Sequence, residues 1–454
     1  MSLLERAPRW ESEDSTDPRH PAPEFPPRQR RRRLWLAVVA AVIVLSAVWV
    51  ALRPGPPSPA PTTTFYVDIT NGTDRASGEA PGSAWRSLAR ATAGLEPGDR
   101  LLLRRGGRWL EPLRVSRSGT EDRPIVIGAY GRGARPEVRG PESCVDLGGS
   151  FFTVRDLELG PCVWAGVRIS GSSNRVAGNV IMGNAAGIVV RRGAIANSLV
   201  GNQLMRNNRM SVLTKRPSND DSGAFGILLQ GDRTEVAHNT ISGSDAFSFD
   251  YRRDGSAIEV FGARRSRIHR NVALENNTFS ELGDRRSADN VYSFNLVRSS
   301  LPGGHGLTTR GAESRYGPVR GTRLEHTTIQ LTGEQSEGFV CHGGCNQGLL
   351  RMRNNIVQAV QKVGFADGSF DEDHNLYWGG ERRFQAGPHS RVAEPRFVDA
   401  FAGDLRLGLG SPAVDMGAPL GPRADLDGRR PPLDGDGDGA ARPDAGAFER
   451  RSTR

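Results

Sequence analysis

The stretch that decides the fold is residues 166–204, GVRISGSSNRVAGNVIMGNAAGIVVRRGAIANSLVGNQL, in which one pattern occurs twice. A Gly-led apolar run at residues 166–169 precedes an apolar cluster around Asn179. A second Gly-led run at residues 187–190 precedes a similar cluster around Asn202. Two short apolar runs in a fixed phase are typical of a repeating unit built from strands.

The Asn cluster recurs along the rest of the chain. It recurs at Asn239, Asn271 and Asn295, more weakly at Thr327, and again at Asn354-Asn355. The intervals between these positions are 23, 37, 32, 24, 32 and 27 residues. We interpret the short intervals as one coil of a solenoid and the longer ones as coils that carry insertions.

The repeat predicts an all-β fold, a right-handed parallel β-helix. A single coil cannot bury its inward Val, Ile and Leu side chains, whereas stacked coils can, and each strand then pairs with its copies above and below. Asn at a bend tolerates left-handed backbone and can bond to the Asn of the next coil. A β-sandwich does not explain two strand types in fixed phase.

Residues 34–52, LWLAVVAAVIVLSAVWVAL, form the one long uncharged run. As a helix they would measure about 28 Å, enough for one bilayer crossing. Five arginines between residues 28 and 33 precede the run, so we expect the N-terminus to be cytoplasmic and the rest extracytoplasmic. The alternative is a cleaved signal peptide, but its apolar region is usually shorter. We therefore predict a single transmembrane signal anchor in the cell membrane.

These observations divide the chain into six parts. We expect a disordered cytoplasmic tail (1–33), the anchor (34–52), a Pro-rich stalk (53–64), an N-terminal cap with the first coils (65–140), the β-helix coils (141–385) and a C-terminal module (386–454). Within the cap, Ser83 is placed to begin a short helix over residues 84–92.

The charge distribution argues against a nucleic-acid partner. The chain has 60 Lys+Arg and 51 Asp+Glu, for a net charge of +9. The excess basic residues are interleaved with acidic residues along the sequence and form no basic stripe. No dinucleotide- or phosphate-binding glycine motif follows a strand. Nothing in the sequence predicts the oligomeric state.

Four cysteines fit an oxidising compartment. Cys144 and Cys162 are close in sequence, and Cys341 and Cys345 are closer still, so we expect two disulfides. The alternative is a metal site at Cys341-His342-x-x-Cys345, although its spacing is not the usual C-x-x-C.

Both ends of the extracytoplasmic part carry a family resemblance. Residues 65–107 (FYVDITNGTDRASGEAPGSAWRSLARATAGLEPGDRLLLRRGG) and 118–138 (SGTEDRPIVIGAYGRGARPEV) resemble the N-terminal segment of secreted β-helix proteins similar to pectate-lyase-like polysaccharide enzymes. Residues 404–432 and 443–449 (PDAGAFE) resemble the module that follows such β-helices. The resemblance implies a polysaccharide ligand, but the fold hosts lyases, hydrolases, epimerases and non-catalytic proteins.

Two stretches, residues 205–225 and 245–286, concentrate the polar candidates. Residues one coil apart stack on one face of a solenoid, so acids from these stretches are expected to converge beside a groove. The candidate catalytic residues are Lys215, Arg252, Arg253, Asp250, Asp254, Glu259 and Glu281. Tyr251, Arg216 and His305 are candidates for substrate binding, and Asp220 and Asp221 for metal binding.

These residue types suit two reactions on a polysaccharide. A lyase acting on an acidic glycan needs Ca²⁺ or Arg to neutralise the sugar carboxylate and a base to remove the α-proton. Lys215 is the first candidate base, followed by Arg252 or Arg253. A glycoside hydrolase needs two carboxyl groups, for which Asp250, Asp254, Glu259 and Glu281 are candidates. We favour the lyase; the alternatives are the hydrolase and a non-catalytic glycan-binding or structural protein.

The C-terminal Asp434, Asp436 and Asp438 alternate with glycines like the start of an EF-hand loop. Position 12 of such a loop, which is normally a Glu that binds Ca²⁺ through both carboxylate oxygens, would be Ala445 here. The alternatives are a looser Ca²⁺ loop, with Asp425, Asp427 or Asp444, and a flexible Asp/Gly turn. Ca²⁺ is the only cofactor to which these residues point.

Overall fold

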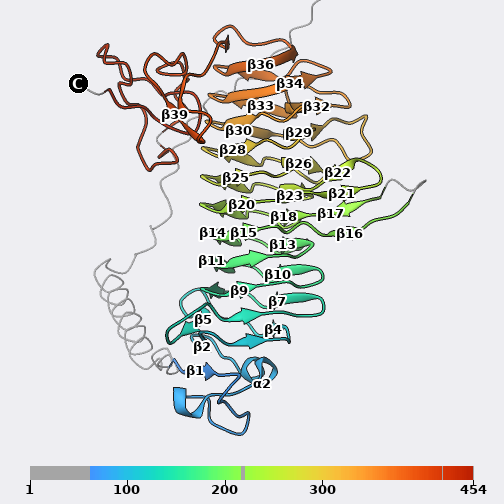
Figure 1. The fold of residues 1–454 in the computed structure, drawn as a ribbon, viewed down its shortest axis with the longest axis vertical. Helices are drawn as coiled ribbons and strands as arrows, with labels where there is room; N and C mark the ends of the chain where they lie inside the picture. Colours follow the sequence, from blue (N-terminus) through green and yellow to red (C-terminus); the bar gives the residue numbers. More distant parts are fainter. Residues whose placement is uncertain (1–61, 216–219, 422, 453–454) are drawn as a thin grey trace, which may run out of the picture. The chain divides into compact units, whose positions relative to one another are not determined.

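The computed structural model describes residues 62–215, 220–421 and 423–452, which belong to one compact unit, Pro61–Arg454. This unit is built almost entirely of β-strands (Figure 1). The predicted tail, the anchor at residues 34–52 and most of the stalk lie outside the described residues. No helix among the residues that the structure describes is long and apolar enough to cross a bilayer.

Each coil contributes up to three strands, one to each of three faces. Face 1 is a 12-stranded parallel sheet. Faces 2 and 3 are two ladders of parallel strands within a 21-stranded sheet, and the long strand β34 joins them because it pairs with both β31 and β32. Along the chain the order is face 1, face 2, face 3, and then face 1 of the next coil. This is the parallel β-helix that the repeat predicts.

The strands of the three faces have the following bounds. Face 1 consists of β1 (Thr64–Val67), β2 (Arg100–Arg104), β5 (Ile125–Tyr130), β8 (Phe152–Arg155), β11 (Arg175–Ala177), β14 (Ser198–Val200), β19 (Glu235–Ala237), β24 (Arg267–His269), β27 (Val291–Ser293), β30 (Thr322–Glu325), β33 (Leu350–Arg353) and β35 (Asp371–Asp373). Face 2 consists of β3 (Arg108–Trp109), β6 (Glu137–Val138), β9 (Glu158–Leu159), β12 (Val180–Met182), β15 (Gln203–Met205), β20 (Thr240–Ser242), β25 (Val272–Leu274), β28 (Leu296–Ser299) and β31 (Thr328–Leu331). Face 3 consists of β4 (Leu113–Val115), β7 (Ser143–Leu147), β10 (Ala165–Ile169), β13 (Ala186–Val190), β18 (Phe225–Leu229), β23 (Ser256–Phe261), β26 (Thr278–Gly283), β29 (His305–Arg310) and β32 (Glu337–His342). The stack ends in β34 (Ile356–Ala366), β36 (Leu376–Arg383) and β37 (Arg391–Val392).

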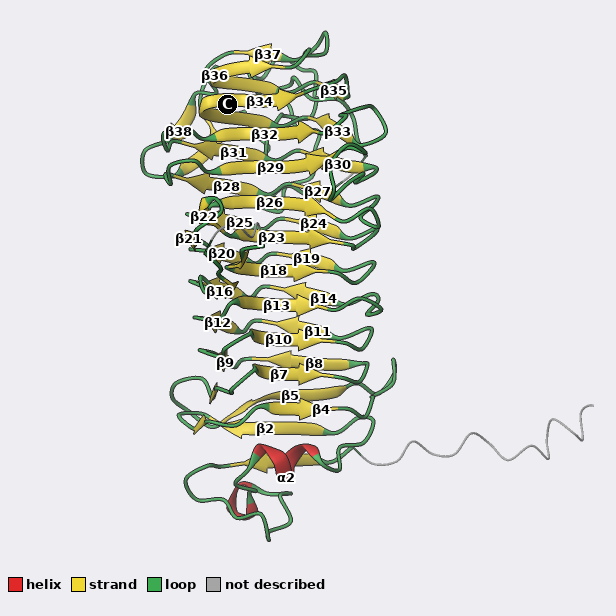
Figure 2. Cartoon of the chain, turned by 90° about the vertical axis from the view of Figure 1, so that its right-hand side faces the viewer, coloured by secondary structure: helices red, strands yellow, loops and turns green. Residues whose placement is uncertain are grey.

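The core lies inside the coils and is made by residues in register. In face 3, Ile188, Ile227 and Ile258 are successive partners across β13, β18 and β23, and all three are fully buried. Figure 2 shows the strands of this face stacked one above another. Because side chains alternate between the two surfaces of a strand, the residues between the inward ones form equally regular rows on the outside.

The recurrent Asn residues form a ladder at the corner between faces 1 and 2. The backbone N–H and Nδ2 of Asn179 both donate to Oδ1 of Asn202, each at 3.1 Å. The same pair of bonds joins Asn202 to Asn239, Asn239 to Asn271 and Asn271 to Asn295. The structure therefore confirms the coil-to-coil Asn contacts.

The last part of this ladder departs from the pattern. Thr327 takes one position and donates only its backbone N–H to Oδ1 of Asn355, at 2.9 Å. Asn355 then bonds to Asn375, which the repeat did not identify. Asn354 stands outside the ladder and bonds to the backbone of Ala418.

Polar ladders also stand at the other two corners. Between faces 3 and 1, the N–H of Asn174 donates to Oδ1 of Asn197 at 2.9 Å. Between faces 2 and 3, the N–H and Nδ2 of Asn184 donate to Oδ1 of Asn207 at 3.2 and 2.9 Å. All four side chains are buried, so the corners use buried amides to satisfy backbone groups that strands cannot pair.

Two antiparallel hairpins interrupt the coils at the corner between faces 2 and 3. The first pairs β16 (Met210–Val212) with β17 (Ser222–Gly223), and the second pairs β21 (Ala246–Ser248) with β22 (Arg252–Asp254). They lie in successive coils and project from the same side of the stack (Figure 1). They account for the long intervals of 37 and 32 residues after Asn202 and Asn239.

The C-terminal segment folds back on the outside of face 2. Its hairpin of β38 (Phe397–Asp399) and β39 (Asp404–Leu407) brings Leu407 into a buried cluster with Ile356 and Leu376. The N–H of Ala447 donates to Oγ1 of Thr328 on β31, at 2.9 Å. This segment therefore covers part of face 2.

The N-terminal cap differs from the prediction in its helix. The α-helix α2 covers Leu88–Thr92 and is capped by Ser87, whose Oγ accepts the N–H of Arg90 at 3.1 Å. Ser83 ends a short 3-10 helix, η1 (Pro81–Ser83). The prediction that Ser83 begins the helix was wrong because Trp85 bridges to Val67 in extended conformation.

The four cysteines form the disulfides Cys144–Cys162 and Cys341–Cys345, which leaves no thiolate for a metal at Cys341 and Cys345.

We predict that Asn207→Ala destabilises the protein while Asn208→Ala does not. Asn207 is buried, accepts two bonds from Asn184 and donates to the Ile181 carbonyl at 3.0 Å. Its neighbour Asn208 is exposed. Loss of the buried amide should lower the free energy of unfolding by roughly 3 kcal/mol, because its partners stay buried without bonds. Urea denaturation of the two variants tests this, and equal midpoints would contradict it.

Candidate functional site

A cavity of about 1210 Å³ lies on the outer surface of face 3, and its lining residues among those that the structure describes run from Trp164 to His342. Its floor is formed by outward side chains of β18, β23, β26, β29 and β32. One wall comes from the two hairpins, through residues 220–222 and 251–254. Register of the coils and the two insertions together thus create a concave surface on an otherwise regular face.

Two glutamates occupy adjacent positions in one outward row of this floor. Glu259 on β23 and Glu281 on β26 are partners in register, and Thr308 on β29 is the next residue of the row. Neighbouring strands are about 4.8 Å apart, so the two glutamates stand side by side although 22 positions separate them. Asp254 reaches the same cavity from β22.

The three carboxyl groups have different surroundings. Glu281 is ion-paired with Arg310, whose Nη1 also donates to the Leu282 carbonyl at 2.9 Å. Glu259 accepts a bond from Oγ of Ser256 at 2.8 Å, and burial, with a contribution from Glu281, raises its pKa well above its usual range. Burial, again with the charge of Glu281, raises the pKa of Asp254 to about 7.

Asp221 and Asp250 hold the two hairpins together. Oδ1 of Asp221 accepts the N–H of Thr214 at 2.8 Å, and its Oδ2 accepts Oγ of Ser248 at 2.8 Å and the N–H of Phe249 at 2.7 Å. Asp250 in turn accepts the N–H of Asp221 at 2.9 Å. These hydrogen bonds, with burial opposing them, lower the pKa of Asp221. Asp250 does not line the cavity.

Asp220 and Asp221 meet one requirement of the predicted metal site. One oxygen each of Asp220, Asp221 and Asp250 lie within 4.8 Å of one another. However, both oxygens of Asp221 already accept hydrogen bonds from the hairpins, and Asp220 accepts a bond from the Thr214 hydroxyl. In the structure these bonds join the two hairpins, and metal binding by Asp220 and Asp221 stays a prediction.

The remaining predicted residues fall into three groups. Tyr251 and Arg252 line the cavity from the second hairpin, and both are exposed. Arg253 also lines it and is ion-paired with Asp245. Lys215 is exposed on the first hairpin and does not line the cavity, and Arg216 lies outside the described residues.

His305 lies at the start of β29, between its register partners Thr278 and Glu337, and it feels the charges of the Glu337 and Glu281 carboxylates. Burial lowers its pKa, and the two carboxylates oppose that effect. Glu337 is itself ion-paired with Lys362 on β34. The imidazole therefore belongs to the polar floor of the cavity.

Sequence reasoning missed Arg310 and, apart from Tyr251, the aromatic lining. Arg310 is the register partner of His342, and both line the cavity. Aligning the Gly- or Ala-led run of each coil would have placed Arg310 two residues beyond the row of Glu259 and Glu281. The aromatic residues that line the cavity are Trp164, Phe225, Tyr251, Phe261 and Tyr316.

A second cavity, of about 1340 Å³, lies against face 1 and the C-terminal segment. Seven arginines and three carboxylates line it. The carboxylates are paired with arginines, as in Glu235 with Arg267 at 3.3 Å and Asp371 with Arg351 at 3.5 Å. All three of its carboxylates are paired with arginines. The face 3 cavity instead combines the arginine-paired Glu281 with Asp254, whose pKa burial raises to about 7, so we take it as the candidate site.

The C-terminal aspartates form turns. Asp434 accepts the N–H groups of Gly437 and Gly439 at 2.6 and 3.1 Å. Asp436 and Asp438 each accept an N–H two residues ahead. One oxygen each of Asp415, Asp434 and Asp436 come within 4.8 Å of one another, so Ca²⁺ binding here stays a prediction.

The fold is shared with several solved structures. The structure is similar to pectate lyase Pel9A (15% identity, 86% of this chain and 97% of that chain, TM-score 0.59). It is also similar to XylC in complex with xylose (11%, 85% and 98%, TM-score 0.53) and to a GH136 lacto-N-biosidase from Eubacterium ramulus (17%, 73% and 67%, TM-score 0.50). No protein-family model and no curated protein sequence matches the chain. The resemblance to pectate-lyase-like right-handed β-helix proteins is thus confirmed for the fold.

We predict that Asp254→Asn makes the protein more stable at neutral pH. The pKa of Asp254 is raised from 3.8 to about 7, so its contribution to stability is complete below pH 4 and is lost as the pH rises to 7. Asn carries no such penalty, so the variant should gain up to about 4 kcal/mol over wild type between pH 4 and pH 8. Urea unfolding at a series of pH values measures the difference, and a difference that does not change with pH would refute the prediction.

Proposed function

We propose that the protein binds a polysaccharide across face 3 and hydrolyses a glycosidic bond in the face 3 cavity. The observation that carries the proposal is the contrast between two carboxyl groups in one cavity. Asp254 has a pKa of about 7 and Glu281 is ion-paired with Arg310. Glycoside hydrolases need one carboxyl group that keeps its proton near neutral pH and one that is ionised.

In this proposal Asp254 is the general acid and protonates the leaving oxygen of the glycosidic bond. The Glu281 carboxylate acts on the opposite side of the sugar, as the base that activates water or as the nucleophile. Arg310 is a positioning residue that holds Glu281, and Glu259 stands beside it in register. Protonated Glu259 would limit repulsion in the row, because burial favours its neutral form.

The lining supports a neutral glycan. Six acidic side chains and four arginines line the cavity. Even with Asp254 and Glu259 protonated, the arginines do not outnumber the remaining carboxylates, so the lining does not attract an anionic polymer. The aromatic residues give apolar platforms of the kind that ligand pockets use. Tyr251, with 52% of its surface exposed, is the most accessible of them at the hairpin wall.

The second candidate is the predicted lyase acting on an acidic glycan. It is favoured by Arg252 and Arg253, which line the cavity and would pair with a sugar carboxylate. Among the described residues, however, Asp254, Glu259 and Glu281 do not form a set whose oxygens lie within 4.8 Å of one another. Those three carboxyl groups do not fit the compact oxygen shell that Ca²⁺ requires, so a Ca²⁺-dependent lyase would use the predicted ligands Asp220 and Asp221.

We also propose that this part of the chain works outside the cytoplasm, held by the predicted membrane anchor. The two disulfides support an oxidising compartment. A non-catalytic glycan-binding protein would have the same location and would use the same face 3 cavity. Binding and cleavage must therefore be measured separately.

Hydrolysis is tested by incubating the full chain with neutral and acidic polysaccharides and measuring new reducing ends. Asp254→Asn and Glu281→Gln should each lower kcat about 100-fold or more, since acid–base catalysis contributes that much. The exposed Glu334→Gln, outside the cavity lining, is the control and should retain activity. Both site variants retaining wild-type kcat on a cleaved substrate would contradict the assignment.

The lyase is distinguished by its product. β-Elimination yields a 4,5-unsaturated uronate that absorbs ultraviolet light, whereas hydrolysis yields none. We expect reducing ends without unsaturation, and no effect of a Ca²⁺ chelator or of Lys215→Ala on the rate. Unsaturated product that disappears with chelation or with Lys215→Ala would replace the hydrolase with the lyase. Saturable binding without either product would replace both with a binding protein.

A further inference from the structure

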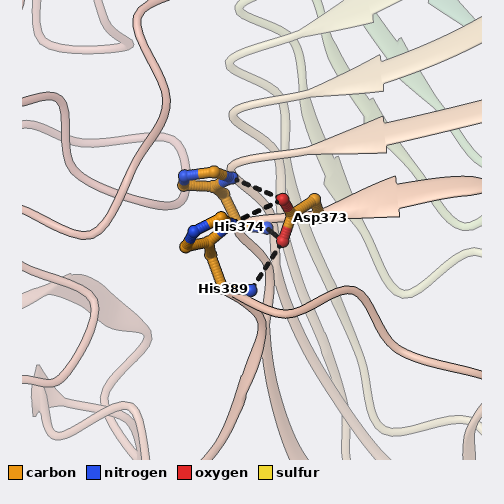
Figure 3. Close-up of side chains that lie close together, drawn as sticks. All are labelled: Asp373, His374 and His389. Atoms are coloured by element: carbon orange, nitrogen blue, oxygen red, sulfur yellow. Dashed lines mark hydrogen bonds and ion pairs between the residues drawn. The ribbon is translucent and has the colours of Figure 1, made fainter.

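A compact group of two histidines and an aspartate lies at the end of the coil stack and is part of the lining of neither cavity. Asp373 is the last residue of β35, and His374 follows it directly. His389 comes from the segment that leads into β37. Figure 3 shows both imidazole rings turned toward the Asp373 carboxylate.

The two oxygens of Asp373 have separate tasks. Oδ1 accepts the backbone N–H of His374 at 2.9 Å and that of His389 at 2.8 Å, which fixes both backbones. Oδ2 lies 2.8 Å from Nδ1 of His389 and 3.3 Å from Nδ1 of His374. The two rings are stacked, with centroids 4.5 Å apart. One oxygen therefore faces two imidazole nitrogens.

Hydrogen bonding accounts for only one of the two imidazoles. Nδ1 of His389 is hydrogen-bonded to Oδ2 of Asp373 at 2.8 Å. Nδ1 of His374 is buried and makes no hydrogen bond, although it lies 3.3 Å from the same oxygen. A buried imidazole nitrogen that faces a carboxylate oxygen without a hydrogen bond is available to a metal ion.

The surrounding residues hold the ligand segment firmly in place. Glu372 is buried and accepts bonds from Nδ2 of Asn375 at 2.7 Å and from the hydroxyl of Tyr377 at 2.9 Å. It also bonds to the backbone N–H of Gly387 and the hydroxyl of Ser390, on either side of His389. The segment that carries His389 is thus fixed to the last coil by Glu372 as well as by Asp373.

We propose that Asp373, His374 and His389 bind a divalent transition-metal ion, with Zn²⁺ as the best chemical match. One donor atom from each residue lies within 4.8 Å of the other two. Donors around tetrahedral Zn²⁺ lie about 3.3 Å apart, given bonds of 2.0–2.1 Å, so small side-chain movements complete the site. Imidazole ligands favour Zn²⁺ and related metals over Ca²⁺ and Mg²⁺, which prefer oxygen.

Three protein ligands leave a coordination position for water, and the exposed His389 places it toward solvent. The ion would tie the segment before β37 to the last turn of face 1 and so close the C-terminal end of the coil stack. None of the three residues lines the face 3 cavity, so the site is independent of the proposed hydrolase.

The test is a Zn²⁺ titration of the tag-free full chain by calorimetry, with Ca²⁺ as the comparison ion and Co²⁺ absorption as the report on ligand geometry. Wild type should bind one Zn²⁺ at this site and gain thermal stability from it. His389→Gln should lower the Zn²⁺ affinity by more than about 10-fold. Even the loss of a residue that only hydrogen-bonds to a metal ligand lowers metal affinity by about that factor. Asp373→Asn, which keeps an oxygen for the backbone N–H groups, should do the same.

His238→Gln is the matched control, because His238 and His269 form another close pair, with ring centroids 6.1 Å apart, outside any three-ligand group found among the described residues. It should bind Zn²⁺ as wild type does. The proposal is overturned if wild type binds no Zn²⁺ saturably, if Ca²⁺ displaces Zn²⁺ from the protein as readily as Zn²⁺ itself does, or if His389→Gln and Asp373→Asn leave the affinity and the Co²⁺ spectrum unchanged.

Discussion

In-register pairing of one coil with the next is the interaction on which the rest of this structure depends. The pairing places Ile188, Ile227 and Ile258 in one row inside the coils and Glu259 and Glu281 in one row on the outer surface. The Asn ladder keeps the coils in phase at the corner between faces 1 and 2, because each amide satisfies groups of the next coil. A slip of one residue would exchange the two rows, so fold and site share a single constraint.

The same constraint explains where insertions are tolerated. Both hairpins leave the stack at the corner between faces 2 and 3 and return to the next strand in register. They change the outside of face 3 without disturbing the core, and they bring Asp254 over the Glu259–Glu281 row. The buried carboxyl groups that result cost stability near neutral pH, as is common where a site needs groups in unfavourable protonation states.

Features with the period of the coil were predictable from the sequence. The Asn ladder and the convergence of Glu259 with Glu281 both follow from counting coils, because the stack converts sequence period into spatial adjacency. Features that do not repeat with the coil could not be predicted from the sequence. Lys215 lies on a hairpin whose path no repeat determines, and Asp250 contacts Asp221 only because two hairpins meet. His374 and His389 come together in the irregular C-terminal end of the stack. In the N-terminal cap, which is equally irregular, Ser87 replaced Ser83 as the helix cap.

The claim that separate coils build one site is tested most directly by disulfide cross-linking of paired cysteine variants, read by mass spectrometry of the peptides. Glu259→Cys with Glu281→Cys should cross-link, because register partners are about 4.8 Å apart and a disulfide spans 4.4–6.8 Å between Cα atoms. Glu259→Cys with Thr308→Cys should not, because the two positions are two strands, or about 9.6 Å, apart. A cross-link in the second pair and none in the first would contradict the register and the site built on it.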